Sequence, residues 1–361
     1  MPRAAKPQKK LILMWAGVLV ASALILPTVL VKQVKMELPI YDPIYEWPVI
    51  EQKQEPVLMI PVYLSRQERV IEVPLEGYVR GVVAAEMPAE FELEALKAQA
   101  IAARTYIVRK IVERDFTKAP TPEAWVTDTA SDQVYATDEE LRARWTRREY
   151  AGKISKINRA VAETRGLILT YDGQPIDATY FSTSNGYTEN SEEYWSETIP
   201  YLRSVASPWD AEISPKYTSV TKMTLQEMME KLGLHDLLAS AIKGGKLGMA
   251  VTERTSGKRI KTVLINGIPF SGREVREKLG LPSSEFTWKI SGDTIEFTTY
   301  GYGHGVGMSQ YGANGMALEG AAAEEILTYY YKGVEIVDLN QIEGWQGAAR
   351  PLASDDSSGG N

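Results

Sequence analysis

Apolar residues recur with helical spacing in two neighbouring stretches of the chain. Residues 75–86 are almost continuously apolar, and residues 92–113 carry an apolar stripe spaced by close to 3.6 residues, formed by Leu93, Leu96, Ala100, Ile107 and Ile111. Alanines crowd the rest of the second stretch, which permits the close approach of a neighbouring element. The pattern predicts two helices, the second of them packed closely in the core.

Further along, strand-like runs are joined by dipeptides that favour two-residue hairpin turns. Such runs stand on both sides of Asp172-Gly173 and of Asn266-Gly267. Another strand pair, and helical patterns that interrupt the strands without regular order, fall in residues 286–301 and near 224–242, 272–279 and 321–332. This order predicts an α+β fold rather than a doubly wound α/β sheet, with residues 206–298 as a smaller inserted subdomain.

An uncharged apolar segment behind a basic flank stands near the amino terminus. Residues 11–31 contain no charged side chain and as a helix would span roughly 32 Å, close to the thickness of a bilayer core. Four basic residues precede them, so we expect a single-pass anchor in the cell membrane, with residues 1–10 in the cytoplasm and the later residues outside. A signal peptide cleaved after Ala23 is the alternative, but the apolar run continues for eight residues beyond it.

Composition separates the rest of the chain into three parts. Residues 32–65 are rich in proline and predict an extended stalk, and residues 346–361 have the composition of a disordered tail. Between them, residues 66–345 are expected to form the globular domain.

The residue inventory excludes several kinds of protein. With 44% hydrophobic and 24% charged residues, the 361-residue chain is globular rather than disordered, and without cysteine it has no disulfide, thiolate ligand or cysteine nucleophile. Two histidines make a structural zinc centre improbable. Residues 1–36 carry six basic residues and no acid, so the remainder has 34 basic against 47 acidic residues and a net charge of −13. An acidic domain argues against a nucleic-acid partner.

Glu86 is the candidate acid. It stands at the end of an apolar helical stretch, and Pro88 disfavours helical geometry at Met87, so the helix should end there. Apolar neighbours and the negative end of the helix dipole both favour the protonated carboxyl, as a general acid requires. The amides of the next helix, expected to begin near Glu90, oppose this. A solvated residue at a helix end is the alternative reading.

Three blocks, in this order and spacing, resemble the stage II sporulation protein D family, across nearly all of residues 70–340: EVPLEGYVRGVVAAEMPAEFELEALKAQAIAARTY, YFSTSNGYTEN and GYGHGVGMSQYGANGMA. The resemblance implies a lytic transglycosylase that cleaves between N-acetylmuramic acid and N-acetylglucosamine in peptide-stripped peptidoglycan and leaves 1,6-anhydro ends. It also implies a role in thinning the septal wall during engulfment, with stage II sporulation proteins P and M as partners. The family's catalytic glutamate falls on Glu86, and Glu90 is expected in the first turn of the next helix.

The same blocks supply candidate substrate-binding residues. On the second predicted helix these are Gln99, Arg104 and Tyr106, in the middle block Ser182, Thr183 and Ser184, and in the glycine-rich block His304, Gln310 and Tyr311. Hydroxyls, amides and aromatic rings suit sugar hydroxyls and pyranose faces. Each also has a structural alternative: a solvated helix face, a turn that bonds its own backbone, or, for His304, a histidine packed against backbone or one that positions Glu86.

No cofactor is expected. The glycine-rich block lacks the lysine of a phosphate-binding loop. Some relatives bind a metal through histidine or cysteine near the middle block, where this chain has Phe181 and Ser184, so we expect no metal here. Two rival functions remain: a noncatalytic glycan-binding activator of a cell-wall amidase, found among proteins with the same domain, and a scaffold of the septal complex.

Overall fold

The computed structural model describes residues 57–234 and 247–345. The predicted cytoplasmic tail, membrane anchor and carboxyl-terminal tail lie outside these residues, as does most of the predicted stalk. Within the described ranges, no helix combines the length and the apolar character that crossing a bilayer requires.

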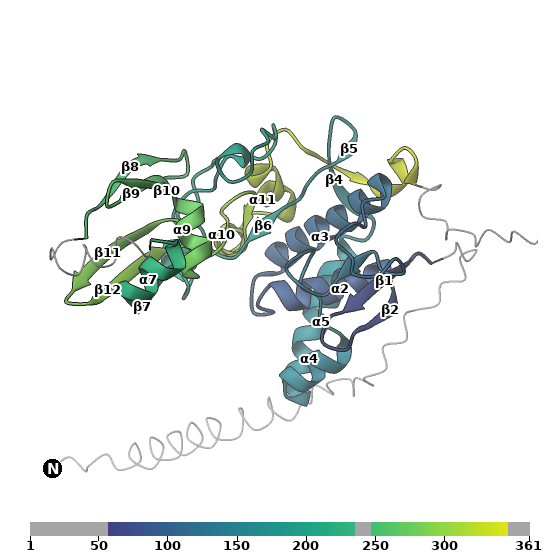
Figure 1. Ribbon diagram of the computed structural model, residues 1–361. Helices are drawn as coiled ribbons and strands as arrows, with labels where there is room; N and C mark the ends of the chain where they lie inside the picture. The colour runs from purple at the N-terminus through teal and green to yellow at the C-terminus, as the bar shows by residue number, and fades with distance from the viewer. Residues whose placement is uncertain (1–56, 235–246, 346–361) are drawn as a thin grey trace, which may run out of the picture. The chain divides into compact units, whose positions relative to one another are not determined.

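The fold mixes helices and strands in an α+β arrangement (Figure 1). Its buried apolar side chains form two clusters. The first cluster is built by these elements, in chain order: β1 (Met59–Leu64), β2 (Arg69–Pro74), α2 (Leu75–Glu86), α3 (Leu93–Glu113), β3 (Val126–Thr127), α4 (Asp138–Arg144), α5 (Arg147–Glu163), β4 (Leu167–Tyr171), β5 (Gln174–Pro175), β6 (Tyr180–Phe181), α6 (Asp210–Ile213), β13 (Met308–Ser309), α10 (Gln310–Leu318), α11 (Ala323–Tyr330) and β14 (Glu335–Asp338).

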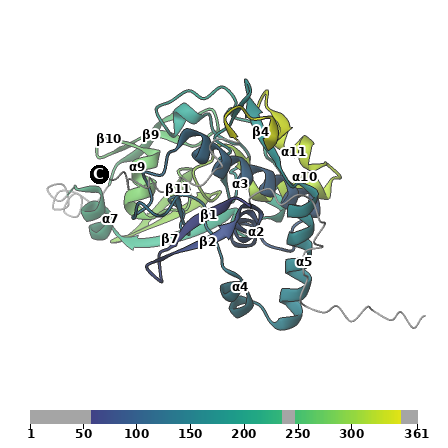
Figure 2. The same ribbon diagram turned by 90° about the vertical axis from the view of Figure 1, so that its right-hand side faces the viewer.

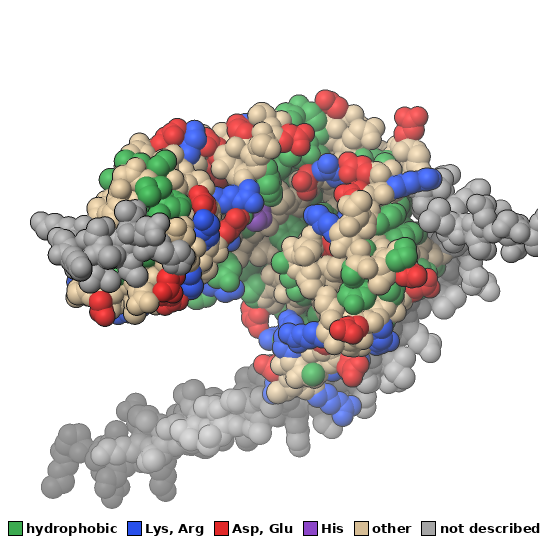
Figure 3. All heavy atoms as spheres, viewed as in Figure 1, with side chains coloured by type: hydrophobic (Ala, Val, Ile, Leu, Met, Phe, Trp, Pro, Cys, Tyr) green, Lys and Arg blue, Asp and Glu red, His purple; other side chains and the backbone are tan. Residues whose placement is uncertain are grey.

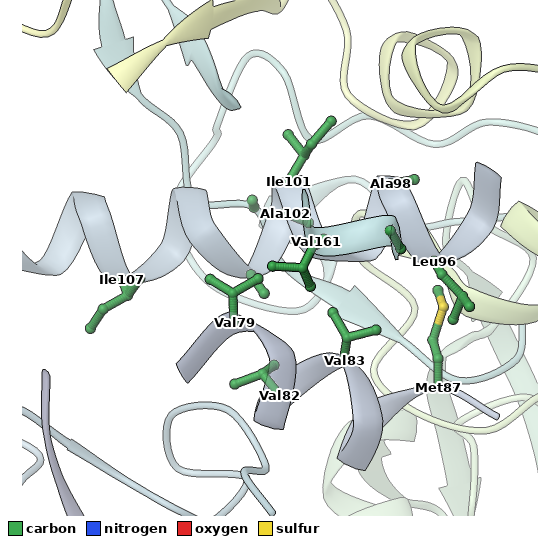
Figure 4. Close-up of a cluster of buried hydrophobic side chains, with 14 of the residues drawn as sticks. Val79, Val82, Val83, Met87, Leu96, Ala98, Ile101, Ala102, Ile107 and Val161 are labelled. Atoms are coloured by element: carbon green, nitrogen blue, oxygen red, sulfur yellow. The ribbon is translucent and has the colours of Figure 1, made fainter. Parts of the chain in front are cut away.

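The centre of this cluster is α3, which is buried on nearly every side. It packs against α2, α5, α10, α11 and β4, and all five alanines between its positions 95 and 103 are buried. Figure 4 shows the apolar contact of α2 with its neighbours, where Val79 and Val83 of α2 lie near Leu96 of α3 and Val161 of α5. Both helices have the predicted bounds to within one residue.

The second cluster draws on residues 223–297. Its elements are β7 (Thr218–Thr224), α7 (Leu225–Leu232), β8 (Met249–Arg254), β9 (Ile260–Ile265), β10 (Ile268–Ser271), α9 (Gly272–Leu279), β11 (Phe286–Ser291) and β12 (Thr294–Tyr300). Two three-stranded antiparallel sheets, ordered β10-β9-β8 and β11-β12-β7, enclose α7 and α9 (Figure 2). The interval agrees with the expected inserted subdomain, whose independence remains a prediction.

Both predicted hairpin turns form. Asp172 and Gly173 have φ of 49° and 74°, and Asn266 and Gly267 have 50° and 83°, the paired positive φ of a type I′ turn. The first turn joins β4 only to the two-residue β5. The run after it does not extend the hairpin, since β6 instead pairs in parallel with β13. This pairing brings the middle block beside the glycine-rich block.

The expected stalk is wrong at its carboxyl-terminal end. Residues 59–64 form β1, which pairs with β2 and β3 and buries Ile60, Val62 and Leu64. The alternation is that of a half-buried strand. Pro61 concealed it in the sequence, although a proline can stand in a strand where its missing N–H has no ladder partner.

Candidate active site

Glu86 is the last residue of α2. Met87 has extended backbone angles, φ −114° and ψ 142°, as expected before Pro88. The carboxyl group is half-buried rather than solvated, and its Oε1 accepts a hydrogen bond of 2.9 Å from the backbone N–H of Val134. The helix thus delivers one acidic side chain into a partly enclosed position.

Burial raises the pKa of Glu86 above the ordinary glutamate value. The backbone N–H of Val134, which donates to Oε1, and the side chains of Gln310 and Tyr180 act in the opposite direction, because they favour the charged form. The amides of a helix beginning near Glu90 were expected to lower the pKa of Glu86. Glu90 instead lies in the turn before α3, which begins at Leu93, so the groups named above lower this pKa in their place. Desolvation is the larger effect, and it favours the protonated acid.

Polar side chains from distant segments surround this carboxyl group. The Tyr78 hydroxyl donates to Gln133 Oε1 at 3.3 Å, and Gln133 Nε2 donates to the Tyr180 hydroxyl at 3.1 Å. The charge of Glu86 adds to burial in raising the pKa of both tyrosines, so both remain neutral donors. Sequence reasoning missed Tyr78, Gln133, Val134 and Tyr180. Two signals were present: Tyr78 lies eight residues before Glu86 on the same helix face, and Tyr180 opens the middle block.

Gln99 and Gln310 are brought together as a buried pair. Gln310 Nε2 donates to Gln99 Oε1 at 3.5 Å, and both side chains are at most 5% exposed. Through Gln310 the pair borders Glu86. In the same block, Tyr311 is half-buried and packs edge-on against Phe91, with ring centroids 4.9 Å apart.

The expectation that Arg104 contacts sugar is wrong for this structure. Arg104 has no exposed surface and forms two parallel hydrogen bonds with Glu76, of 2.9 and 2.7 Å. It also donates to the carbonyl of Leu167 at 3.1 Å, so it joins α3 to α2 and β4. Tyr106, expected on the same ligand-binding face, donates to Asp132 at 2.8 Å. Both side chains stabilise the core around the site.

Ser182, Thr183 and Ser184 diverge in role. Ser182 keeps exposed surface, whereas Thr183 and Ser184 are fully buried. Thr183 Oγ1 lies 2.7 Å from Ser214 Oγ, and Ser184 bonds to Asp210. Direct sugar contact by Thr183 or Ser184 is therefore excluded in this structure.

Asp210, which sequence reasoning did not select, organises this loop. It is fully buried, and its Oδ1 accepts from Ser184 N at 2.8 Å and from the Ser309 hydroxyl. Its Oδ2 accepts from the hydroxyls of Ser184 and Ser207, at 2.9 and 2.7 Å. Ser309 caps α10, which begins at Gln310, so Asp210 ties the middle block to the helix that carries Gln310.

His304 is a half-buried histidine bonded to backbone on both ring nitrogens. Nδ1 accepts from Val306 N at 3.1 Å, which leaves Nε2–H to donate to the Tyr180 carbonyl at 3.0 Å. Burial lowers the pKa of His304 to about 4, so the ring is neutral at physiological pH. Both nitrogens are used, and the ring instead positions Tyr180, which borders Glu86. These contacts agree with the packed reading, and a role of His304 in positioning Glu86 stays a prediction.

Asp132 is a second carboxylate close to Tyr78, because the charges of Asp132 and Glu86 both add to burial in raising the pKa of Tyr78. It binds Lys110 Nζ at 2.7 Å, the Tyr106 hydroxyl and the backbone N–H of Thr127. These donors lower its pKa despite burial. Asp132 is therefore held as an anion by structural contacts, whereas burial raises the pKa of Glu86.

The site therefore holds a half-buried carboxyl group with a raised pKa, close to neutral tyrosine and amide side chains. Residues 63–171 match the family model described as a stage II sporulation protein. The chain is 52% identical to stage II sporulation protein D of Bacillus subtilis and 50% identical to that of Bacillus amyloliquefaciens, each across 80% of this chain and 81% of the relative. It is also 31% identical to an amidase enhancer of Bacillus subtilis, over 72% of this chain and 40% of the relative. The chain belongs to the stage II sporulation protein D family, a family of sporulation proteins.

Proposed function

We propose that this protein is a lytic transglycosylase that cleaves the bond between N-acetylmuramic acid and N-acetylglucosamine in peptide-stripped peptidoglycan. The observation that supports it is the half-buried carboxyl group of Glu86 with its raised pKa. A raised pKa favours the protonated carboxyl, which can give its proton to a departing glycosidic oxygen.

One carboxyl group suffices for this reaction. Most glycosidases pair an acid with a second carboxylate that activates water or attacks the sugar. Here the nucleophile is the C6 hydroxyl of the same muramyl residue, which attacks C1 intramolecularly and gains a high effective concentration. Glu86 protonates the departing oxygen, and the resulting carboxylate then takes the proton of the C6 hydroxyl. The C1–O bond to the leaving sugar breaks, the C1–O6 bond forms, and no water is consumed.

The surrounding residues take supporting roles in this proposal. In this proposal Tyr180 and Gln310 stabilise the carboxylate that exists between the two proton transfers, because both side chains favour the charged form of Glu86. Ser182 and Tyr311, which keep exposed surface, are the proposed sugar contacts. Gln99 holds Gln310 from behind.

The proposed setting is the sporulation septum. We propose that residues 11–31 anchor the chain in the cell membrane with the domain outside the cytoplasm, since this segment is uncharged and follows a basic flank. There the enzyme would thin the septal wall during engulfment, with stage II sporulation proteins P and M as partners.

The test compares the full-length chain with its Glu86→Gln variant on stripped glycan strands, with mass analysis of the released 1,6-anhydro ends. Glutamine keeps an oxygen that can accept from Val134, but its amide group is too weakly acidic to protonate the leaving oxygen. The rate should therefore fall at least about 100-fold while strand binding persists. Glu92→Gln is the matched control, because Glu92 is exposed and makes no side-chain cap bond. Wild-type activity should also decline with rising pH above the ordinary glutamate pKa. A Glu86→Gln variant that cleaves at the wild-type rate would refute the assignment.

A noncatalytic activator of a cell-wall amidase is the second candidate, favoured by the similarity to an amidase enhancer. It predicts that the wild-type chain releases no anhydro ends and yet accelerates a purified amidase on intact peptidoglycan. Glu86→Gln would then leave that acceleration unchanged.

A further inference from the structure

A cluster of arginines stands at the corner where α4 meets α5, on a chain whose net charge is −7. Arg142, Arg144, Arg147 and Arg148 fall within seven consecutive residues, and all four are exposed. None of them pairs with a carboxylate in the part of the chain that the structure describes. Figure 3 shows basic side chains gathered over the region of α4 and α5. We refer to these four residues as the arginine corner.

The corner is held rigidly. Two capping boxes, Thr137 with Glu140 and Thr146 with Glu149, fix the starts of α4 and α5. The Arg142 guanidinium lies 4.2 Å from the centre of the Tyr150 ring. Arginines carried on a fixed backbone lose less conformational entropy when they bind an anion than arginines on a mobile loop.

A groove leads from this corner to the residues that follow Glu86. A cavity of about 370 Å³ is lined by Arg148, Lys153 and Lys156 of α5 on one side and by Ala89 and Glu90 on the other, together with Glu149 and Gly152. Lys153 Nζ binds Glu90 at 2.8 Å, and Lys156 donates to the backbone carbonyls of Glu90 and Phe91. Ala89 is three residues from Glu86, a separation of at most about 11 Å along the chain.

We propose that the arginine corner and this groove bind the lactyl carboxylates of a stripped glycan strand whose scissile bond lies at Glu86. The proposal rests on the proposed function. Removal of the stem peptide leaves one free carboxylate on the lactyl group of each N-acetylmuramic acid, so a stripped strand carries a regular row of anions. Guanidinium groups match carboxylates with two parallel hydrogen bonds. Continuity with the turn after Glu86 favours the substrate strand over a lipid surface as the occupant.

The test measures binding and cleavage by full-length variants. In one variant Arg144, Arg147 and Arg148 are changed to Gln, and in the matched control Arg66, Lys118 and Lys289 are changed to Gln. All six are exposed, and both variants lose three positive charges. Binding is measured in a Glu86→Gln background against stripped strands and against the same strands with their carboxylates converted to methylamides. Thermal unfolding verifies that both variants fold.

We expect the corner variant to bind stripped strands about tenfold more weakly and the control to bind as the parent does. The affinity of the parent for methylamidated strands should be weaker than its affinity for stripped strands by about the same factor. The corner variant should bind both kinds of strand equally weakly. In cleavage, KM should rise with little change in kcat. Equal binding by the corner variant and the parent, or an equal loss on both kinds of strand, would overturn the proposal. So would a corner that binds vesicles with anionic lipid but shows no preference for carboxylated strands.

Failure of the two proposals is distinguishable. If the wild-type chain releases no anhydro ends but binds strands in a carboxylate-dependent manner through the corner, the proposed catalysis is wrong and the binding surface stands. If cleavage depends on Glu86 but is indifferent to the corner and to methylamidation, the reverse holds.

Discussion

Asp210 offers a sharp test of how the buried polar network supports the site. Replacement by alanine removes four accepted hydrogen bonds. All three hydroxyls have other oxygens within reach: Ser184 Oγ lies 3.0 Å from the Ser207 carbonyl, Ser207 Oγ lies 2.8 Å from the Tyr330 hydroxyl, and Ser309 Oγ lies 3.5 Å from the Ser182 carbonyl. The N–H of Ser184 has no such alternative. An orphaned buried amide costs about 1–3 kcal/mol and the vacated space adds to this, so Asp210→Ala should lose about 3 kcal/mol.

Asp210→Asn should lose much less, about 1 kcal/mol. The amide oxygen can replace Oδ1 and accept from Ser184 N and the Ser309 hydroxyl. The amide nitrogen then donates to the hydroxyls of Ser184 and Ser207, which rotate to accept. Neutral asparagine also avoids burying a charge, the effect that raises the pKa of Asp210.

The assay is urea unfolding of the full-length variants, with stability taken from the midpoint at constant m-value. Because the folded-state pKa of Asp210 is raised, the folded protein holds a proton that the unfolded chain has released, and wild-type stability falls as the pH rises through that interval. The asparagine variant lacks this dependence, so its deficit should shrink with rising pH. Equal losses for alanine and asparagine would refute the acceptor geometry, and a loss below about 0.5 kcal/mol for alanine would refute the network itself.

Three further predictions follow from packing and charge. Gly312→Ala places a methyl group against the Tyr330 hydroxyl and should cost about 1–3 kcal/mol in urea unfolding, whereas Gly152→Ala, in open space on α5, should stabilise by up to about 1 kcal/mol. Arg104→Gln should cost about 3 kcal/mol, because it leaves a carboxylate without its ion-pair partner, and thermal unfolding will measure it. By NMR, His304 should titrate near pH 4 as the Nε2–H tautomer, and its depressed pKa removes at most about 3 kcal/mol of stability as pH falls from about 6.5 to 4; a titration near 6.5 would contradict this.

Local pattern was sufficient to predict the elements whose signals are local. The two long helices carry uninterrupted apolar spacing, and both Asp-Gly and Asn-Gly turns need only their own residues. Helix α5 was not predicted because few of its residues are apolar, although Thr146 with Glu149 offered a capping signal. Helix α10 was missed because its glycines argue against a helix. Gly312 and Gly315 are there because the side chains of Tyr330 and Trp209 leave no room for a Cβ.

The site divides in the same way. The helix, its apolar residues and the following proline made Glu86 a candidate, and the family resemblance gave it the catalytic role, which stays a prediction. Arg104 was misassigned because its partner Glu76 lies 28 residues away, and a spacing argument within one helix cannot show a partner on another. Val134 and Gln133 were missed for the corresponding reason, since they reach the site from a segment without regular structure or apolar pattern.

The buried network holds in place the polar groups that lower the pKa of Glu86. The side chains that oppose burial at Glu86 are those of Tyr180 and Gln310, on β6 and at the start of α10. His304 holds the Tyr180 carbonyl, and Asp210 holds the capping residue of α10, so each donor is fixed through its backbone by a group that does not reach the substrate. Disturbing either anchor should therefore displace a donor and raise the pKa of Glu86 further. His304→Gln and Asp210→Ala should then both shift the descending limb of the pH–rate profile upward, whereas Asp210→Asn, which can still accept from Ser309, should shift it little. A purely structural role would instead lower activity equally at every pH.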